Sequence, residues 1–392
     1  MKKKKVLFIV YYFIQAGGER YVYEIAKHLN KEKYEVHFLK ITPNLSNKNW
    51  STEYYYEPTI QAGCQIHFYP DLIAADNNLQ KLLRQEKMTR FIPVGRVQAK
   101  ASTEVAKRKK QILSKFLQKF DIVNWMGIGA YAHLGNSLEK GAYKEYIHIL
   151  STKFQYDDDC YAKWDKQKGY TFFTPFSPWL LEKELEGFTN FRHIYFPMSL
   201  ELIPYSVVPT PRNNKHTIAV FSRIDRMKPM EPYLYALKLL REKKIDAQLY
   251  IYGAGDPKAT GLKRQIDHLY LSDNVHFKGH AESLAQVMKS GEIDLVWFQS
   301  GNNRPAGFAA FEIAMSGIPQ VFWDFGHYVA EPEYNQVYPN FTNLSKFVDC
   351  SANLLTDKSV ATELGEQQKK FVLQNQNIQK NIKIIEQEFD MV

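Results

Sequence analysis

Short runs of β-branched and aromatic residues alternate along the chain with segments of helical periodicity. In the first half this pattern predicts strands at residues 5–11, 34–39, 65–69, 122–125, 146–150 and 170–173, and a helix at 18–30. Strands that alternate with helices are typical of βαβ units, which build parallel sheets. The pattern therefore predicts an α/β domain with a doubly wound sheet.

The alternation lapses near residues 203–214, where Pro204, Pro209 and Pro211 lie among polar residues, as in an interdomain linker. A second series follows, with strands predicted at 217–221, 247–252, 275–278, 295–298 and 320–323 and helices at 229–243, 258–269, 283–289 and 308–316. We therefore expect two Rossmann-like domains that face each other across a cleft. The expected ranges are a first domain at 1–205, a linker at 206–214, a second domain at 215–375 and a final helix at 376–392 that packs back on the first domain.

The composition is that of an ordinary globular protein, because 45% of the 392 residues are hydrophobic and 24% are charged. The longest apolar run, residues 6–14, is far shorter than the roughly 18 residues that a membrane span needs. Three widely spaced cysteines fit neither a disulfide framework nor a metal cluster. These features predict a cytoplasmic protein, and its net charge of +9 favours anionic partners.

Two segments place glycine or cations directly after a predicted strand. Gly17 and Gly18 precede a helix whose free N–H groups could hold a phosphate or a sugar hydroxyl; the alternative is a tight turn. Arg223 and Lys228 follow the first strand of the second series, where they could hold a diphosphate; the alternative is a solvated loop paired with Asp225.

Two further segments of the second series contain candidate binding residues or glycine turns. The turn 253–255 has only two glycines of a dinucleotide fingerprint, and no chemistry is assigned to it. The segment 300–319 is a polar loop followed by an apolar helix that contains Glu312. A carboxylate among apolar neighbours needs a partner, such as the two hydroxyls of a ribose. The alternative is an exposed Glu on an amphipathic helix.

Taken together, these motifs resemble the family-four group of retaining glycosyltransferases with the GT-B fold. The resemblance lies in residues 17–20, 223–228, 253–255, 274–279 and 307–319, in this order and at similar spacing. It covers most of the second domain and only the opening βα unit of the first.

The resemblance implies a nucleoside-diphosphate sugar donor held mainly by the second domain, and a glycan, lipid-linked or protein acceptor held mainly by the first. It implies no metal and no cofactor, because Arg223 and Lys228 would neutralise the leaving diphosphate. Glu312 would bind the ribose, and Gly17, Gly18 and Gly307 would lie against the donor. These family members often have a first-domain His that faces the donor sugar.

His148 is the first candidate for this histidine, and His133 is the second. A structural histidine is the alternative for either one.

One position departs from the family pattern. Seven residues separate two glutamates in the family, and Arg304 occupies the place of the first. Either the donor sugar is recognised differently, with Arg304 favouring an acidic or phosphorylated group, or the chain is a catalytically silent GT-B partner or sugar-binding subunit.

A basic stretch in the first half has no counterpart among these motifs. Lys107, Arg108, Lys109 and Lys110 precede apolar residues at helical spacing, up to Lys119. Such a segment could rest on an anionic membrane, and a solvated core helix is the alternative. No nucleic-acid-binding module is recognised, so nucleic acid is not expected as a partner.

Overall fold

The computed structural model describes residues 2–43, 53–89, 95–151, 160–175, 178–203, 205, 207, 215–225, 228–300, 307–324 and 336–392. The chain divides into two compact units. Unit 1 comprises Met1–Pro197 and Gln379–Val392, and unit 2 comprises Met198–Ile378. The first unit thus ends eight residues before the predicted boundary at 205, and it includes the end of the chain. Most of the predicted linker 206–214 lies outside the described residues.

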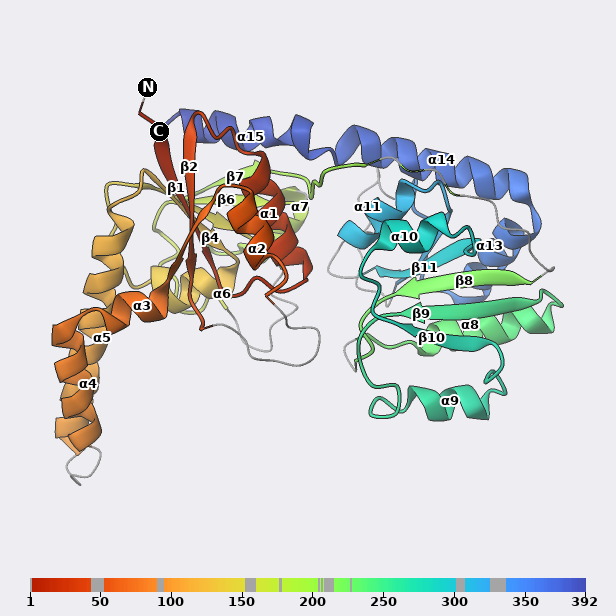
Figure 1. The fold of residues 1–392 in the computed structure, drawn as a ribbon, viewed down its shortest axis with the longest axis horizontal. Helices are drawn as coiled ribbons and strands as arrows, with labels where there is room; N and C mark the ends of the chain where they lie inside the picture. Colours follow the sequence, from red (N-terminus) through yellow and green to blue (C-terminus); the bar gives the residue numbers. More distant parts are fainter. Residues whose placement is uncertain are drawn as a thin grey trace. The chain divides into compact units, whose positions relative to one another are not determined.

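Unit 1 is built on a seven-stranded sheet in the order β3-β2-β1-β4-β5-β6-β7, and its strand pairs are parallel (Figure 1). The strands are β1 (Lys4–Val10), β2 (Tyr34–Lys40), β3 (Gln65–Phe68), β4 (Ile122–Met126), β5 (Lys144–His148), β6 (Tyr170–Thr174) and β7 (Phe191–Tyr195). β1 lies between β2 and β4, with Val6 opposite Val36 on one side and Ile122 on the other. The chain therefore reverses its winding direction at β1, as in a Rossmann-like sheet.

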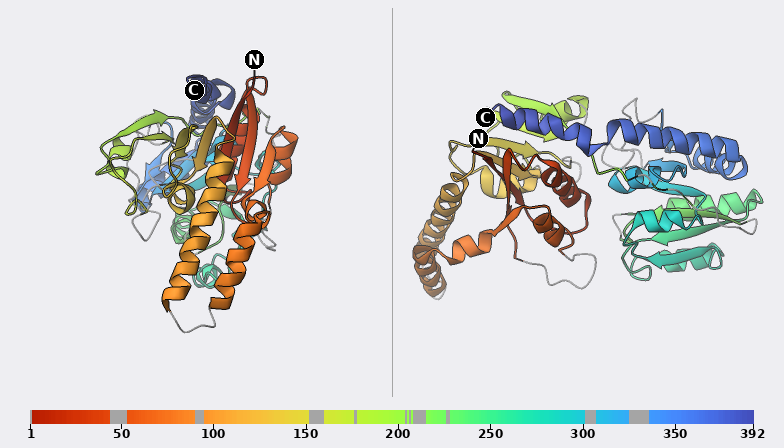
Figure 2. Two further views of the ribbon diagram at one scale, coloured as in Figure 1. Left: turned by 90° about the vertical axis from the view of Figure 1, so that its left-hand side faces the viewer. Right: turned by 45° about the horizontal axis from the view of Figure 1, so that its top comes forward.

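The helices of unit 1 are α1 (Gly17–His28), α2 (Tyr56–Gln61), α3 (Tyr69–Ala74), α4 (Asn77–Thr89), α5 (Gly95–Leu117), α6 (Ile128–Ala130), the π-helix η1 (Tyr131–Gly135), α7 (Pro178–Glu184) and α15 (Ile378–Asp390). α4 and α5 pack side by side and project from the unit as a hairpin (Figures 1 and 2). α15 brings the end of the chain back to the first strand, because Lys4 Nζ donates to the Phe389 carbonyl at 3.0 Å.

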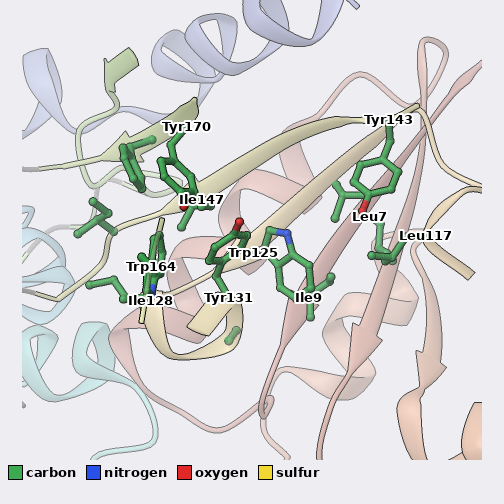
Figure 3. Packing of buried hydrophobic residues seen from close by; sticks show 14 of the residues in the cluster. Leu7, Ile9, Leu117, Trp125, Ile128, Tyr131, Tyr143, Ile147, Trp164 and Tyr170 are labelled. Atoms are coloured by element: carbon green, nitrogen blue, oxygen red, sulfur yellow. The ribbon is translucent and has the colours of Figure 1, made fainter. Parts of the chain in front are cut away.

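A core rich in aromatic side chains packs against one face of this sheet (Figure 3). Leu7 and Ile9 of β1 and Trp125 of β4 are fully buried there. The indole N–H of Trp125 is satisfied by the Glu145 carboxylate at 2.9 Å. Leu117, at the end of α5, lies in the same cluster, so the root of the hairpin is part of the core.

Unit 2 has a six-stranded sheet in the order β10-β9-β8-β11-β12-β13, again with parallel pairs (Figure 1). Its strands are β8 (His216–Phe221), β9 (Ala247–Tyr252), β10 (Val275–Gly279), β11 (Leu295–Ser300), β12 (Gln320–Asp324) and β13 (Asn340–Phe341). Its helices are α8 (Glu231–Glu242), α9 (Leu262–His268), α10 (Leu284–Lys289), α11 (Phe308–Ala314), α13 (Leu344–Thr356) and α14 (Lys358–Asn375).

The observed elements confirm the predicted fold class, with two Rossmann-like α/β units in tandem. Each predicted strand is present within two residues of its expected ends. α9 begins four residues later than predicted, because Gly261 precedes it with a left-handed φ of 79°. The predicted cleft between the domains stays a prediction.

Candidate functional site

The loop after β8 places the predicted diphosphate-binding residues at the point where the sheet of unit 2 reverses direction. β8 lies between β9 and β11, and Arg223 and Lys228 follow its carboxyl end. The strand next to β8 in the sheet is β11, and α11 is the helix that follows it in the chain. Ligands of open α/β sheets bind at this kind of position.

The turn 253–255 fixes this loop by direct backbone contact. Ser222 N donates to the Tyr252 carbonyl at 3.0 Å, and Ile224 N donates to the Ala254 carbonyl at 2.8 Å. A Cβ on Gly253 would lie 1.8 Å from the Ser222 carbonyl oxygen, and one on Gly255 would lie 2.1 Å from the Ile224 carbonyl oxygen. Both glycines are therefore required for the two loops to touch. This structural role explains the two-glycine turn, to which the sequence assigned no chemistry.

The two cations of the loop have different surroundings. Arg223 is about half exposed, and its Nε lies 3.5 Å from Asp225 Oδ2, as the alternative interpretation of the loop expects. Burial, and secondarily the charge of Arg223, lowers the pKa of the Lys228 ammonium. Lys228 forms no ion pair within the described residues, and it lines a cavity of about 130 Å³ together with Asp225, Glu231 and Thr260. A partly buried cation that forms no ion pair within the described residues favours the binding of an anion, although the nearby Asp225 partly opposes the lowering of its pKa.

Of the predicted segment 300–319, residues 301–306 lie outside the described residues, and Gly307 immediately precedes α11. A Cβ on Gly307 would meet no atom of the described residues within 4 Å, so among these residues the space beside its backbone is open. Glu312 lies on α11 and is partly buried, and its backbone carbonyl accepts a hydrogen bond from Tyr205 Oη at 3.1 Å. Arg304 lies outside the described residues.

In unit 1, Gly17 and Gly18 form the first turn of α1, directly after the central strand β1. The residue before them, Ala16, gives this helix no side-chain cap. Leu150, shortly after the end of β5, lies beside this turn. Its Cδ1 would lie 3.6 Å from a Cβ on Gly18.

Glu19, next to this glycine pair, is an acidic residue in the first turn of α1. Burial raises its pKa to about 7, and the charge of Glu53 adds to the increase, although a backbone hydrogen bond opposes it. Glu53 itself is held by the fully buried Lys40 ammonium at 2.8 Å and by the Phe13 N–H at 2.9 Å. The segment 17–20 carries part of the family resemblance, but the raised pKa of Glu19 depends on residues from distant segments and leaves no local pattern.

His148, the first candidate for a catalytic histidine, is fully buried in unit 1. Its Nε2 lies 3.1 Å from Asn124 Oδ1, while Asn124 Nδ2 donates to the Leu7 carbonyl at 3.3 Å. Its Nδ1 lies 3.2 Å from Tyr21 Oη, and burial lowers its pKa to about 3. We infer that Nε2 donates and Nδ1 accepts, so both nitrogens of a neutral ring are used. These surroundings favour the structural alternative over contact with a substrate.

His133, the second candidate, lies in η1, shortly after the carboxyl end of β4. Its side chain is exposed, and its ring stacks at 6.5 Å on that of Tyr11, which follows β1. Its Nδ1 is 3.4 Å from Tyr11 Oη, which donates to the Gly129 carbonyl at 3.1 Å. β1 and β4 flank the reversal point of this sheet, so His133 occupies the end at which a ligand would bind.

The part of the chain that the structure describes offers no site of two other kinds. No group of three His, Cys, Asp or Glu side chains there could hold a metal ion. None of the described helices is long and apolar enough to cross a membrane.

Several solved structures share this fold over nearly the whole chain. HepE from Anabaena in complex with UDP-glucose has a TM-score of 0.68 at 12% identity, covering 99% of this chain and 100% of that one. Sucrose-phosphate synthase from Thermosynechococcus elongatus has a TM-score of 0.67 at 14% identity, with 99% of each chain covered. A TarM variant from S. aureus, in complex with fondaparinux, α-GlcNAc-glycerol and UDP, has a TM-score of 0.66 at 12% identity, covering 98% and 99%.

Two Rossmann-like units in tandem, with candidate ligand-binding residues at the reversal point of each sheet, define a protein of the GT-B fold. Residues 206–371 match the family model described as glycosyl transferases group 1. This match covers most of unit 2, and together with the GT-B fold it makes the chain a glycosyltransferase. No curated protein shows significant sequence similarity to it.

Proposed function

We propose that this glycosyltransferase moves a sugar from a nucleoside-diphosphate sugar to a glycan, lipid-linked or protein acceptor, with retention of configuration and without a metal ion. The observation that carries the proposal is Lys228, a partly buried cation without an ion-pair partner among the described residues, near Arg223 on the loop after β8. The fold relationship to HepE, solved with UDP-glucose, adds support for a donor of this class.

The proposed chemistry follows from charge. When the bond between the sugar and the diphosphate breaks, negative charge develops on the leaving phosphate oxygens. Lys228 would act as a point charge toward them, and Arg223 would offer a planar fork of N–H donors after exchanging Asp225 for phosphate. Fixed cations that face developing charge lower the barrier, and a divalent metal ion is then not needed for this task.

Other residues would hold the remaining parts of the donor. Glu312 would accept hydrogen bonds from the ribose hydroxyls, and the open space beside Gly307 would admit the donor close to the backbone. The uncapped start of α1 at Gly17 and Gly18 would bind the phosphates or the transferred sugar. We also propose that Arg304 selects an acidic or phosphorylated donor sugar. Turnover with a panel of neutral and acidic nucleotide sugars tests this role.

The first experiment measures nucleotide binding by calorimetry, with UDP, GDP and their sugars in buffer that contains EDTA. Lys228→Ala should weaken binding of the preferred nucleotide about ten- to a hundredfold, because a charge-assisted contact is worth roughly 1.5–3 kcal/mol. Lys258→Ala removes an exposed lysine of the same unit and should bind as the wild type does. If no nucleotide binds at millimolar concentration, or if both variants bind equally, the donor-site assignment is wrong.

The second experiment identifies the product by NMR. A donor with an α-linked sugar should give an α-linked product, which would support retention. Inversion at the anomeric carbon would reject that part of the proposal, and turnover that requires added metal would reject metal independence.

A further inference from the structure

The positive charge of this protein is concentrated in the α4–α5 hairpin. Residues 77–119, which span α4, α5 and the two residues after it, contain 12 Lys and Arg but only two Asp and Glu. The rest of the chain contains 39 Lys and Arg and 40 Asp and Glu, so it is close to neutral. The whole net charge of +9 is therefore explained by one projecting element (Figure 2).

The basic side chains of this hairpin take little part in holding the fold together. Lys81, Arg84, Lys107 and Lys110 are exposed and form no ion pair within the described residues. Arg108 differs, because it holds Asp76 at the root of the hairpin through Nη2 at 2.7 Å and Nε at 3.1 Å. Like charges on adjacent helical turns repel each other, so this arrangement is stabilised when an anionic partner is bound.

The apolar side of α5 is not available to a membrane. Leu113, Phe116 and Leu117 are buried in the core of unit 1, as the alternative of a core helix expects. Figure 3 shows Leu117 in this cluster. Met88 is the one large apolar side chain of the hairpin that is exposed among the residues described. A helix that lies in a membrane interface needs an exposed apolar face, which the described part of the hairpin lacks. Its surface fits a partner that is bound by charge.

The basic residues are also too widely spread for a single small anion. Lys107 and Lys115 are about 12 Å apart along α5 at 1.5 Å per residue, and Lys81 and Arg84 lie on the other helix. Only a partner with several anionic groups along a flexible chain can neutralise them together. We propose that the α4–α5 hairpin is the docking surface for an anionic polymer, a glycan that bears phosphate, sulfate or carboxylate groups. That this polymer is the acceptor rests on the proposed function.

The test measures binding of fluorescent dextran sulfate by anisotropy, with neutral dextran of the same length as the control ligand. The full chain should bind only the sulfated form, and its affinity should fall at least about tenfold between 50 and 200 mM NaCl, as expected for several charge contacts. Replacing Lys81, Arg84, Lys107 and Lys110 by Glu should weaken binding at least tenfold further.

A matched control distinguishes the effect of charges on the hairpin from the effect of the net charge of the protein. Replacing Lys263, Lys346, Lys358 and Lys370 of unit 2 by Glu changes the net charge equally at exposed sites, and should weaken binding less than about threefold. Equal effects of the two sets of substitutions would overturn the proposal. So would tighter binding to phosphatidylglycerol vesicles, or to single-stranded RNA of equal charge, than to dextran sulfate.

The same variants distinguish a failure of the hairpin proposal from a failure of the proposed donor site. UDP binding should be unchanged in both quadruple variants, because the hairpin is not part of the donor site. Loss of UDP binding in every form, with dextran sulfate still bound through the hairpin, would reject the donor site alone. Sulfated oligosaccharides that bind the hairpin but yield no transfer product with an active donor would reject the acceptor role.

Discussion

A Cβ added to Gly253 would lie 1.8 Å from the backbone oxygen of Ser222, so the turn after β9 and the loop after β8 are in direct backbone contact. The same loop contains Arg223 and ends at Lys228, so the position of both cations depends on this contact. A side chain at residue 253 must separate the two loops, because a backbone carbonyl cannot rotate away as the end of a flexible side chain can.

Gly253→Ala should therefore lower both stability and nucleotide affinity. Overpacking of this kind costs about 1–3 kcal/mol, measurable by urea unfolding. Gly307→Ala is the matched comparison, because its Cβ meets no atom of the described residues within 4 Å, and the free energy of unfolding should change by less than about 0.5 kcal/mol. Donor affinity should fall in Gly307→Ala only through contact with the ligand. A Gly253→Ala variant as stable as the wild type would contradict the bracing role of this turn.

Removing each of the two candidate histidines should affect a different property of the protein, stability in one case and turnover in the other. His148→Ala leaves a cavity and removes the ring that binds Asn124 and Tyr21, so unfolding should become easier by about 2–4 kcal/mol. His133→Ala removes an exposed ring beside the reversal point of the sheet, so it should lower turnover with little change in melting temperature. Stability comes from thermal unfolding, and turnover from nucleotide release. The reverse pattern would assign the substrate contact to His148.

These residues also show which features of the fold and site can be predicted from the sequence. Buried strands such as β1 and β8 could be located, because nearly continuous apolar runs have few other stable structures. β7 was missed, since Arg192 and His193 interrupt its apolar pattern. The burial of His148 depends on Tyr21 and Asn124, and the role of Gly253 depends on Ser222, 31 residues earlier. Such contacts between distant segments leave no local pattern, whereas the βα order that places Arg223 and Lys228 does.

The end of the chain should be essential to unit 1. Phe389 of α15 is fully buried, and its ring lies 5.8 Å from that of Tyr34 and 5.6 Å from that of Tyr146. Phe389→Ala should therefore destabilise unit 1 by about 3–5 kcal/mol. Met391→Ala, two residues further on, removes a mostly exposed side chain and should have no measurable effect. Urea unfolding followed by tryptophan fluorescence compares the two variants, and equal midpoints would show that α15 is dispensable.

The remaining prediction concerns pH and the stacked pair His37 and His67. His37 Nδ1 lies 3.1 Å from His67 Nε2, so the contact needs one donor and one acceptor, and a fully protonated pair cannot form it. Burial is the largest cause that lowers the pKa of both rings, although the Glu35 carboxylate, 2.9 Å from His37 Nε2, partly opposes it. Lys5 lowers the pKa of His37 further, as Lys119 does for His67.

The sign of the pH effect follows from these lowered pKa values. Unfolded histidines take up protons near their ordinary pKa of about 6.5, whereas the folded pair does so only at lower pH. The unfolded state therefore binds more protons as the pH falls, and the stability that is present above pH 6.5 is lost progressively below it. His67→Phe keeps ring contacts with Phe116 and Phe120 but removes the titrating pair. Its urea midpoint should fall less between pH 8 and 5.5 than that of the wild type, whereas the exposed control His268→Gln should follow the wild type. If His67→Phe loses as much stability as the wild type over this range, the acid sensitivity arises elsewhere.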